Sequence, residues 1–515
     1  MMSSNNQTTA KLMIQGTSSS VGKSVLAAAF CRIFYQEGYH VSPFKAQNMA
    51  LNSFVTTSGG EMGRAQVVQA QAAGVEPDVR MNPILLKPSG PTGSQVVIMG
   101  KSQGNVTALR YHGEYQRMTW SYVTEALYGL LDEYEMVVIE GAGSPAEVNL
   151  KSNDIVNMRV AMEINSPVLL VADIDRGGAL ASVVGTLELV EPEERALIKG
   201  IIFNKFRGEI KLLQPALDFI EEKTGIPVVG VVPYFKIRIP DEDSVAINEA
   251  AEKPSVSLEE QLDVAVIRLP YISNFTDFDA LQDEPDVSVR YVTDPANLGK
   301  PDLLIIPGSK NTLADLRFLH ESGIGKHIQT LCAEEIPVIG ICGGYQMMGR
   351  LVKDPLHTES ELEEVSGLGI LPMVTEFYPQ KHTVQSKGTI LTNHGFFKAC
   401  TGETVVGYEI HMGRTTMDEG HSPLFNLTSN EESNVDGMQV GNAYGTYLHG
   451  IFDNDSLRTS LLNWLWQRRG SQRPVEASLS QAALRESAFN ELADLVRQNV
   501  DLERIRAIMG LRTES

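Results

Sequence analysis

Short apolar runs alternate with helical patterns through the first half of the chain. The runs are apolar at nearly every position, which is typical of parallel strands covered by helices on both faces. Between several of them, apolar residues recur at the spacing of amphipathic helices. The predicted strands are 12–15, 41–44, 96–99, 136–139, 167–172, 198–203 and 228–232, and the predicted helices include 23–36, 64–73 and 179–190. The pattern therefore predicts a doubly wound α/β sheet.

This pattern is interrupted at residues 235–261, which are polar, acidic and broken by prolines. Such composition is typical of a linker, and a long surface loop within one domain is the alternative. A second α/β series follows, and residues 456–515 are mostly helical in composition. Its predicted parallel strands are 264–269, 287–291, 303–306 and 338–341, and antiparallel strands are expected at 389–391, 405–411 and 438–440. The sequence predicts one domain over 1–235, a linker over 236–261 and a second domain over 262–515 that ends in a helical segment.

Length and composition agree with two globular domains. The chain has 515 residues, of which 43% are hydrophobic and 21% charged, which is ordinary for globular proteins. It contains no apolar stretch of transmembrane length and no pattern of a secretory signal at its start. Its four cysteines are widely spaced and form no metal-binding pattern. We therefore expect a cytoplasmic protein without structural disulfides.

The formal net charge of −21 disfavours binding to nucleic acid or to an anionic membrane. It does not disfavour small anionic substrates, because a local basic pocket can override the overall charge. A homo-oligomeric state remains open.

A phosphate-binding loop follows the first predicted strand, with the sequence Gly16-Thr-Ser-Ser-Ser-Val-Gly-Lys-Ser24. Small residues let backbone N–H groups converge on phosphate oxygens, so Gly16, Thr17 and Gly22 are expected to contact ATP. Lys23 is expected to reach the terminal phosphates, and the Ser24 hydroxyl to bind Mg²⁺. The spacing between the two glycines is one residue longer than the usual pattern. In this respect the loop resembles that of dethiobiotin synthetase, whose relatives act on carboxylates.

Polar residues also follow other predicted strands, at the edge where doubly wound sheets bind nucleotides. Glu140 comes directly after strand 136–139 and is the predicted second ligand of Mg²⁺. Glu147, in the same segment, is a candidate to face the substrate. Asn204 follows strand 198–203, and it resembles base-contacting residues of related nucleotide-binding proteins. A solvated turn is the alternative for Asn204.

A nucleophile elbow is predicted at Cys342, where strand 338–341 runs into Cys342-Gly-Gly-Tyr-Gln346. The glycines allow a tight turn, and the start of a helix favours the thiolate, which is the attacking form. Backbone N–H groups at Gly343 and in the turn around Gly308 are the predicted oxyanion hole. His449 is the predicted base that takes the thiol proton and later protonates departing ammonia.

These segments resemble the triad-type, class I-like glutamine amidotransferase domain, which frees ammonia from glutamine. In that family a glutamate usually follows the histidine by two positions, but here that position is Ile451. The prediction is therefore a dyad of Cys342 and His449, with either slow glutaminase chemistry or another residue that orients His449. For His411, a contact with substrate and a structural role remain equally open.

The combination of the two domains resembles the cobalamin-pathway amidases, and most closely the cobyric acid synthases. The matching segments are 45–53, 61–66, 82–88, 140–147, 204–208 and 444–450. The resemblance implies that ATP and glutamine are used to amidate the b, d, e and g carboxylates of adenosylcobyrinic a,c-diamide through acyl phosphates. It also implies ATP and Mg²⁺ as cofactors. Lys45, Arg64 and Lys87 are candidates to bind this anionic corrinoid, with ordinary surface charge as the alternative.

Two other functions remain as alternatives. The nearest is the sister amidase that makes the a,c-diamide itself, against which the segment Gln47-Asn-Met-Ala-Leu-Asn52 favours cobyric acid synthase. The non-enzymatic alternative is a partitioning-type ATPase switch. The phosphate loop of such switches carries an early second lysine, where this chain has Thr17 or Ser18.

Overall fold

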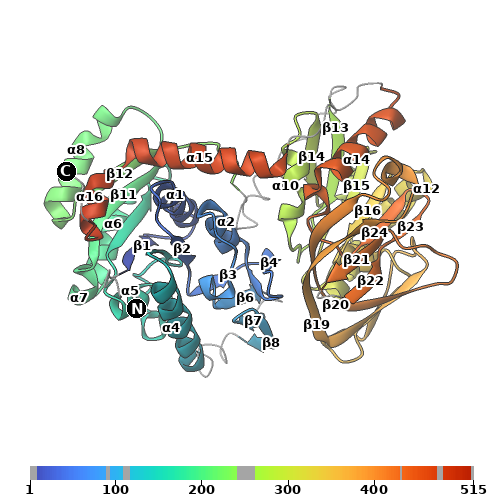
Figure 1. Ribbon diagram of the computed structural model, residues 1–515, viewed down its shortest axis with the longest axis horizontal. Helices are drawn as coiled ribbons and strands as arrows, with labels where there is room; N and C mark the ends of the chain where they lie inside the picture. The colour runs from blue at the N-terminus through green and yellow to red at the C-terminus, as the bar shows by residue number, and fades with distance from the viewer. Residues whose placement is uncertain are drawn as a thin grey trace, which may run out of the picture.

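The computed structural model describes residues 9–88, 93–107, 116–239, 261–429, 432–471 and 480–511. They form two α/β halves that lie side by side (Figure 1). Most of the predicted linker, 236–261, falls on residues 240–260 and so lies outside the described residues. None of the described helices combines the length and hydropathy that a membrane span requires.

The first half is built on a six-stranded parallel sheet in the order β12-β11-β10-β1-β9-β2. Successive residues of β1 face different cores: Met13 packs into one, and Leu12 and Ile14 into the other. Both faces are thus covered, as the continuous apolar runs predict. The strands are β1 (Ala10–Gly16), β2 (Val41–Phe44), β9 (Met136–Glu140), β10 (Val168–Asp173), β11 (Ile198–Phe206) and β12 (Val228–Pro233). The helices are α1 (Lys23–Gln36), α2 (Arg64–Ala72), α4 (Gln116–Glu133), α5 (Met158–Glu163), α6 (Ala179–Leu189), α7 (Pro192–Arg195) and α8 (Ile210–Thr224).

One predicted strand of this half does not join the parallel sheet. Residues 96–99 overlap β7 (Gly93–Ile98), which pairs antiparallel with β6 (Ile84–Pro88) and β8 (Lys101–Thr107). Met99 and Gly100 both have positive φ angles, and this tight turn closes a hairpin. β3 (Gln47–Met49) completes this small sheet, and β4 (Ser53–Val55) pairs with β5 (Glu61–Gly63) beside it. An apolar run alone does not distinguish a hairpin strand from a central parallel one.

The second half contains another six-stranded sheet, in the order β14-β13-β15-β16-β24-β23. Only β23 runs antiparallel to its neighbour, so the predicted parallel series is confirmed. These strands are β13 (Leu262–Ile267), β14 (Val287–Val292), β15 (Leu303–Ile306), β16 (Val338–Ile341), β23 (Met438–Val440) and β24 (Ala443–Thr446). Helices α10 (Asp279–Gln282), α11 (Thr312–Glu321), α12 (Ile324–Ala333) and α13 (Gly343–Met347) accompany them.

A further sheet of the second half faces the first half. Its long hairpin pairs β19 (Met373–Ile390) antiparallel with β20 (Thr404–Met417). β17 (Leu351–Lys353), β18 (Glu364–Ser366), β21 (Phe425–Ser429) and β22 (Glu432–Asp436) extend it. The antiparallel strands expected beyond residue 366 are therefore present.

The helical C-terminal segment, which the sequence assigned to the second domain, is divided between the two halves. α14 (Asp455–Arg468) packs on the second half, but α15 (Gln481–Asn499) and α16 (Leu502–Ile508) return to the first (Figure 1). Phe489 and Leu492 of α15 are buried against α1 in one core. Arg32 of α1 donates a hydrogen bond to Asn490 at 3.0 Å. Composition alone does not indicate which sheet face such a helix covers.

Phe489→Ala should lower the free energy of unfolding of the first half by about 3–5 kcal/mol, because a buried aromatic ring leaves a cavity when it is removed. Thermal or denaturant unfolding would measure this loss. Gln498→Ala, at an exposed position of the same helix, is the matched control. If Phe489→Ala left the unfolding transition of the first half unchanged, this result would contradict the docking of α15 on α1.

Candidate nucleotide and glutaminase sites

The predicted phosphate loop joins β1 to α1 at the carboxyl edge of the first sheet. Gly22 has a φ of 102°, a conformation that favours glycine. A Cβ at Gly22 would lie 2.1 Å from the amide nitrogen of Asn204. That nitrogen donates to the carbonyl oxygen of Val21 at 2.9 Å. Asn204 therefore supports the loop from β11, and its contact with a base stays a prediction.

Lys23 folds across the loop. Its Nζ donates to the carbonyl oxygens of Ser18 at 2.9 Å and Gly143 at 3.0 Å. Gly143 belongs to the segment that follows β9, so the lysine links the two predicted phosphate-side elements. Thr17 is fixed at the start of the loop, where its N–H donates to the carbonyl oxygen of Val171 at 2.9 Å.

The Glu140 carboxylate is buried at the end of β9 and accepts four hydrogen bonds from residues that the structure describes. Its Oε1 accepts from Ser24 Oγ at 2.7 Å and from Lys45 Nζ at 2.9 Å. Its Oε2 accepts from the side-chain amides of Gln69 at 2.6 Å and Gln66 at 3.3 Å. Ser24 and Glu140, the two predicted Mg²⁺ ligands, are thus in direct contact. A hydroxyl and a carboxylate are oxygen donors of the kind that Mg²⁺ prefers, so this pair fits the ion.

Two of the predicted corrinoid-binding cations differ from expectation. Lys45 and Lys87 are both buried, and each forms an ion pair within the protein, Lys45 with Glu140 and Lys87 with Glu61 at 2.7 Å. Burial lowers the pKa of Lys87 to about 8, against the opposing effect of Glu61. The alternative interpretation of both lysines as ordinary surface charges is therefore wrong, because both are buried and neutralise buried carboxylates.

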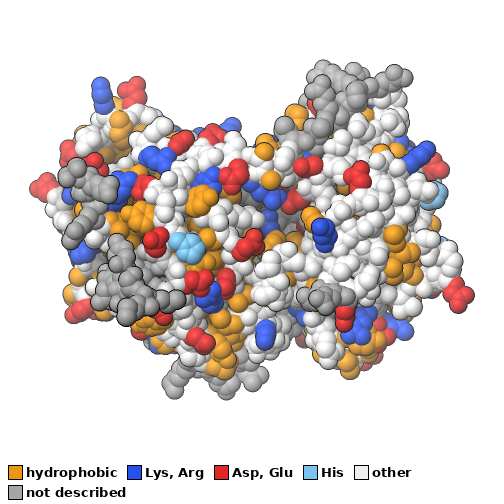
Figure 2. Space-filling view, viewed as in Figure 1, with side chains coloured by type: hydrophobic (Ala, Val, Ile, Leu, Met, Phe, Trp, Pro, Cys, Tyr) orange, Lys and Arg blue, Asp and Glu red, His pale blue; other side chains and the backbone are white. Residues whose placement is uncertain are grey.

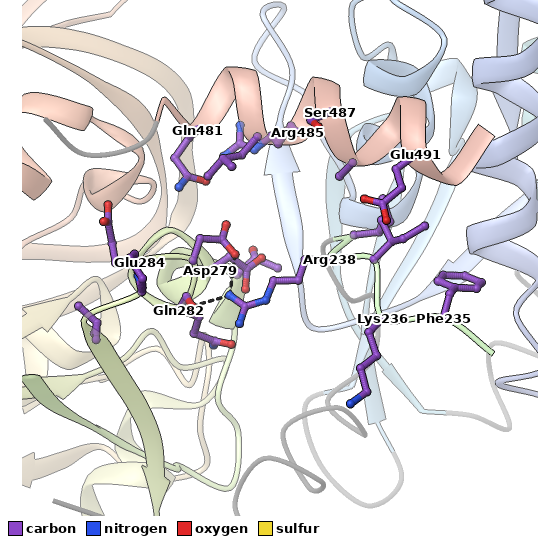
Figure 3. A pocket seen from close by; sticks show the side chains of 18 of the residues that line it. Phe235, Lys236, Arg238, Asp279, Gln282, Glu284, Gln481, Arg485, Ser487 and Glu491 are labelled. Carbon is purple, nitrogen blue, oxygen red and sulfur yellow. Dashed lines mark hydrogen bonds and ion pairs between the residues drawn. The ribbon is translucent and has the colours of Figure 1, made fainter. Parts of the chain in front are cut away.

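The other two candidates for contact with the substrate, Arg64 and Glu147, lie elsewhere. Arg64 is also buried, with its guanidinium over the ring of Phe54, and it lines a cavity of about 700 Å³ between the two halves. Figure 2 shows Lys and Arg side chains gathered in the hollow between the halves. In Figure 3, Arg238 reaches across the cavity toward the second half, where it pairs with Asp283 at 2.8 Å. Glu147 is exposed in the loop after β9.

Cys342 occupies the turn between β16 and α13 with φ 51° and ψ −107°. This conformation is strained for a residue other than glycine and is typical of a nucleophile elbow. The space around it is tight: a Cβ at Gly344 would lie 1.9 Å from a carbonyl oxygen of β15. A Cβ at Gly343 would lie 2.8 Å from the backbone nitrogen of Ser309. The turn that contains Gly308 therefore packs on the elbow, as the predicted oxyanion hole requires.

His449 lies next to the nucleophile and is held by Asp277, a residue that no motif in the sequence indicates. Its Nδ1 is 2.7 Å from Oδ2 of Asp277, and both side chains are buried. Asp277 Oδ1 also accepts a hydrogen bond from the Gly450 N–H at 3.0 Å. Burial alone would lower the pKa of His449, but Asp277, together with a hydrogen bond to Cys342, raises that pKa to about 10.

Asp277 takes the position of the third member of a triad. The sequence predicted a dyad of Cys342 and His449 with either slow chemistry or another residue that orients His449, and the hydrogen bond between His449 and Asp277 agrees with the second of these possibilities. Asp277 lies in a short 3-10 helix, Phe275–Phe278, on the chain after β13. The one sequence signal for it was a polar residue soon after a strand of the same sheet as Cys342.

His411 follows a residue that contacts the nucleophile: the Cys342 thiol donates a hydrogen bond to the carbonyl oxygen of Ile410 at 3.6 Å. Its ring stacks on Tyr447 at 3.8 Å, and its Nδ1 is 2.8 Å from the Gly413 carbonyl oxygen. With His382 and Glu409 it forms the one group of three or more His, Cys, Asp or Glu side chains, among the described residues, that could hold a metal ion. The contacts of His411 are all with protein groups, so both the substrate contact and the structural role of His411 stay open.

Known families match both halves of the chain. Residues 12–244 match the CobQ/CobB/MinD/ParA nucleotide binding domain, and residues 263–457 match the CobB/CobQ-like glutamine amidotransferase domain. A cobyric acid synthase of Desulfitobacterium hafniense is 69% identical over 99% of both chains. That of Pelotomaculum thermopropionicum is 52% identical over 97% of this chain and 96% of its own. That of Yersinia enterocolitica is 49% identical over 97% of this chain and 98% of its own. The chain therefore belongs to the cobyric acid synthase family, whose members are glutamine-hydrolysing ligases that form carbon–nitrogen bonds.

Proposed function

We propose that the chain converts the b, d, e and g carboxylates of adenosylcobyrinic a,c-diamide to amides and so produces cobyric acid. The observation that carries this proposal is the presence, in one chain, of a phosphate loop with Glu140 and a Cys342–His449–Asp277 arrangement. The full-length similarity to cobyric acid synthases supports the choice of acceptor. Glutamine supplies the nitrogen, and ATP supplies the driving force.

In the glutaminase half, the Cys342 thiolate attacks the side-chain carboxamide carbon of glutamine. Backbone N–H groups at Gly343 and around Gly308 stabilise the oxyanion that forms. The protonated His449 gives its proton to the departing ammonia, and a thioester remains. Water activated by His449 then hydrolyses the thioester to glutamate and frees the thiol. Asp277 fixes the imidazole orientation and stabilises its protonated form.

In the ligase half, an acceptor carboxylate attacks the terminal phosphate of ATP, which gives an acyl phosphate and ADP. A carboxylate is a poor electrophile, and phosphorylation supplies the leaving group that ammonia displaces. The loop from Gly16 to Gly22 and Lys23 bind and orient the phosphates. Ser24 and Glu140 would hold Mg²⁺, which when bound neutralises phosphate charge. Arg64, at the wall of the cavity between the halves, is the candidate cation for the corrinoid.

The acceptor is tested by offering two corrinoids separately, with ATP and glutamine. We expect adenosylcobyrinic a,c-diamide to be amidated and cobyrinic acid to be left unchanged, as chromatography of the products would show. Amidation of cobyrinic acid alone, and only twice, would identify the sister amidase instead. A partitioning-type switch would release no ammonia from glutamine.

Asp277→Asn should lower glutamine hydrolysis by roughly 10²–10⁴-fold, because an amide neither fixes the required tautomer nor stabilises the imidazolium. His449 must be protonated when ammonia leaves, and Asp277 raises the pKa of His449. Loss of that charge lowers this pKa, so the alkaline limb of the glutaminase pH profile should move to lower pH. Steady-state rates across pH would measure both effects. Asp279→Asn, two residues along the chain, is the matched control, and equal rates in all three proteins would contradict the role of Asp277.

A further inference from the structure

The long hairpin of the second half carries three side chains of metal-binding type on one face. Its strands β19 and β20 pair antiparallel, and His382 of β19 lies directly opposite His411 of β20 (Figure 1). Glu409 precedes His411 by two residues, so both side chains extend from the same face of β20. The pairing shifts between Phe377 and His382, and irregularities of this kind commonly re-aim a side chain. Two imidazoles and one carboxylate thus meet on two paired strands.

The distances between these side chains suit one shared ion. Oε2 of Glu409 lies 3.8 Å from Nε2 of His382 and 3.7 Å from Nε2 of His411. Both distances are longer than a hydrogen bond. One ligand atom from each of the three residues lies within 4.8 Å of the other two. Ligands of a tetrahedral Zn²⁺ lie about 3.3 Å apart, because each bond is about 2.0–2.1 Å long. An ion between these atoms therefore requires side-chain movements but no change in the strand pairing.

The tautomer of His411 is the one that a metal ligand needs. Its Nδ1 lies 2.8 Å from the carbonyl oxygen of Gly413, which only accepts, so Nδ1 carries the proton. Nε2 of the neutral ring then presents a lone pair. This atom is buried and has no hydrogen-bond partner among the residues that the structure describes. Buried polar atoms normally have a partner, and metal-bound histidines typically donate their other N–H to a carbonyl or carboxylate oxygen.

The Glu409 carboxylate is also held in place by a neighbour. Its Oε1 accepts a hydrogen bond from the Ser386 hydroxyl at 2.5 Å, so Oε2 is left for the two histidines. The side chains of Glu409 and His411 are only 12% and 11% exposed, whereas that of His382 is 40% exposed. Two ligands are thus fixed by packing and hydrogen bonds, and the third lies on the side from which an ion would enter.

We propose that His382, Glu409 and His411 bind a divalent transition-metal ion of the Zn²⁺ class, through Nε2 of each histidine and Oε2 of Glu409. Imidazole and carboxylate ligands in this ratio suit Zn²⁺, whereas Mg²⁺ and Ca²⁺ prefer oxygen ligands alone. Three protein ligands leave one coordination position for water or another small ligand. The site is separate from the Ser24–Glu140 pair, and no step of the proposed reaction passes through it.

The ion would fasten β20 beside the nucleophile. Ile410 lies between two of the ligands on β20, and its carbonyl oxygen accepts from the Cys342 thiol at 3.6 Å. Because His382 belongs to β19, the ion would also join the two strands of the hairpin. An ion that binds only the folded arrangement stabilises it by mass action. At about 100 times its dissociation constant, Zn²⁺ should raise the Tm of the second half by about 5–10 °C.

The site is tested by equilibrium dialysis of the chelator-treated full chain against Zn²⁺, with excess Mg²⁺ to fill sites made of oxygen ligands. We expect about one Zn²⁺ per chain in the wild-type protein and in Cys342→Ala, which lacks the catalytic thiol as a competing ligand. His382→Ala and Glu409→Gln should weaken binding at least about 10–100-fold, because loss of an outer partner alone costs this much. Ser386→Ala, which removes such an outer partner, should weaken it by about 10–100-fold. His394→Ala, at an exposed histidine of the same half, is the matched control and should bind as the wild type does.

Two further measurements complete the test. Co²⁺ in the wild-type protein should show the visible absorption of nitrogen and oxygen ligands without a sulfur-to-metal charge-transfer band. Metal-free His382→Ala should unfold at the same temperature as the metal-free wild-type protein, and added Zn²⁺ should no longer raise its Tm. Absence of stoichiometric Zn²⁺ binding by the wild-type protein, or wild-type affinity in His382→Ala and Glu409→Gln, would overturn the proposal. Binding that disappears in Cys342→Ala would overturn it too, because the ion would then belong to the catalytic thiol.

Discussion

Cys342→Ala should abolish amidation with glutamine, by at least about 10⁴-fold, and leave amidation with ammonium salts near the wild-type rate. Removal of a catalytic nucleophile costs this much because no other group can form the covalent intermediate. Ammonia from solution bypasses the glutaminase step, since the acyl phosphate forms in the other half. Initial rates with each nitrogen source, at saturating ATP and corrinoid, would measure the difference.

Cys332→Ala is the matched control, because Cys332 is partly exposed on α12 and lies outside the elbow. It should keep both activities. If Cys342→Ala lost the ammonium-dependent activity too, the residue would support the fold instead of the chemistry. Full glutamine use in Cys342→Ala would exclude it as the nucleophile.

Lys23→Met should abolish amidation from both nitrogen sources, by roughly 10²–10⁴-fold, while the unstimulated hydrolysis of glutamine remains. Lys23 lies between the loop and the segment after Glu140, where it can reach the charge that develops during phosphoryl transfer. Methionine keeps much of the length and apolar volume of the stem but removes the positive charge. ADP release and amide formation, measured together, would show whether the acyl phosphate still forms.

The control for Lys23→Met is Lys199→Met, at an exposed position of β11 in the same sheet. It should leave all rates unchanged. Retention of ATP-dependent amidation in Lys23→Met would show that the loop does not supply the phosphate-binding cation. Loss of the unstimulated glutaminase as well would indicate a general loss of folding.

The elements that the sequence predicts well are those set by local pattern. The phosphate loop and the Cys342 elbow both follow a buried strand and precede a helix, and their glycines meet atoms that leave no room for a Cβ. Such requirements are written into a few consecutive residues. For the same reason the two sheets and most of their strands could be predicted from apolar runs.

What the sequence does not show depends on contacts between distant segments. Asp277 reaches His449 only because β13 and β24 belong to one sheet. Lys45 and Lys87 look like surface cations until their buried carboxylate partners are known. α15 carries an apolar face of ordinary composition, and only the folded chain shows that it covers α1. These features follow from tertiary packing and not from any local motif.

The central claim is that one chain frees ammonia from glutamine and transfers it to four carboxylates of a corrinoid. It is tested most directly with glutamine labelled with ¹⁵N in its amide, together with ATP, Mg²⁺ and adenosylcobyrinic a,c-diamide. Mass spectrometry of the final product counts the labelled amides. We expect four labelled amides in a product identical to cobyric acid. A final product with fewer labelled amides, or labelling of cobyrinic acid in place of the a,c-diamide, would contradict the claim.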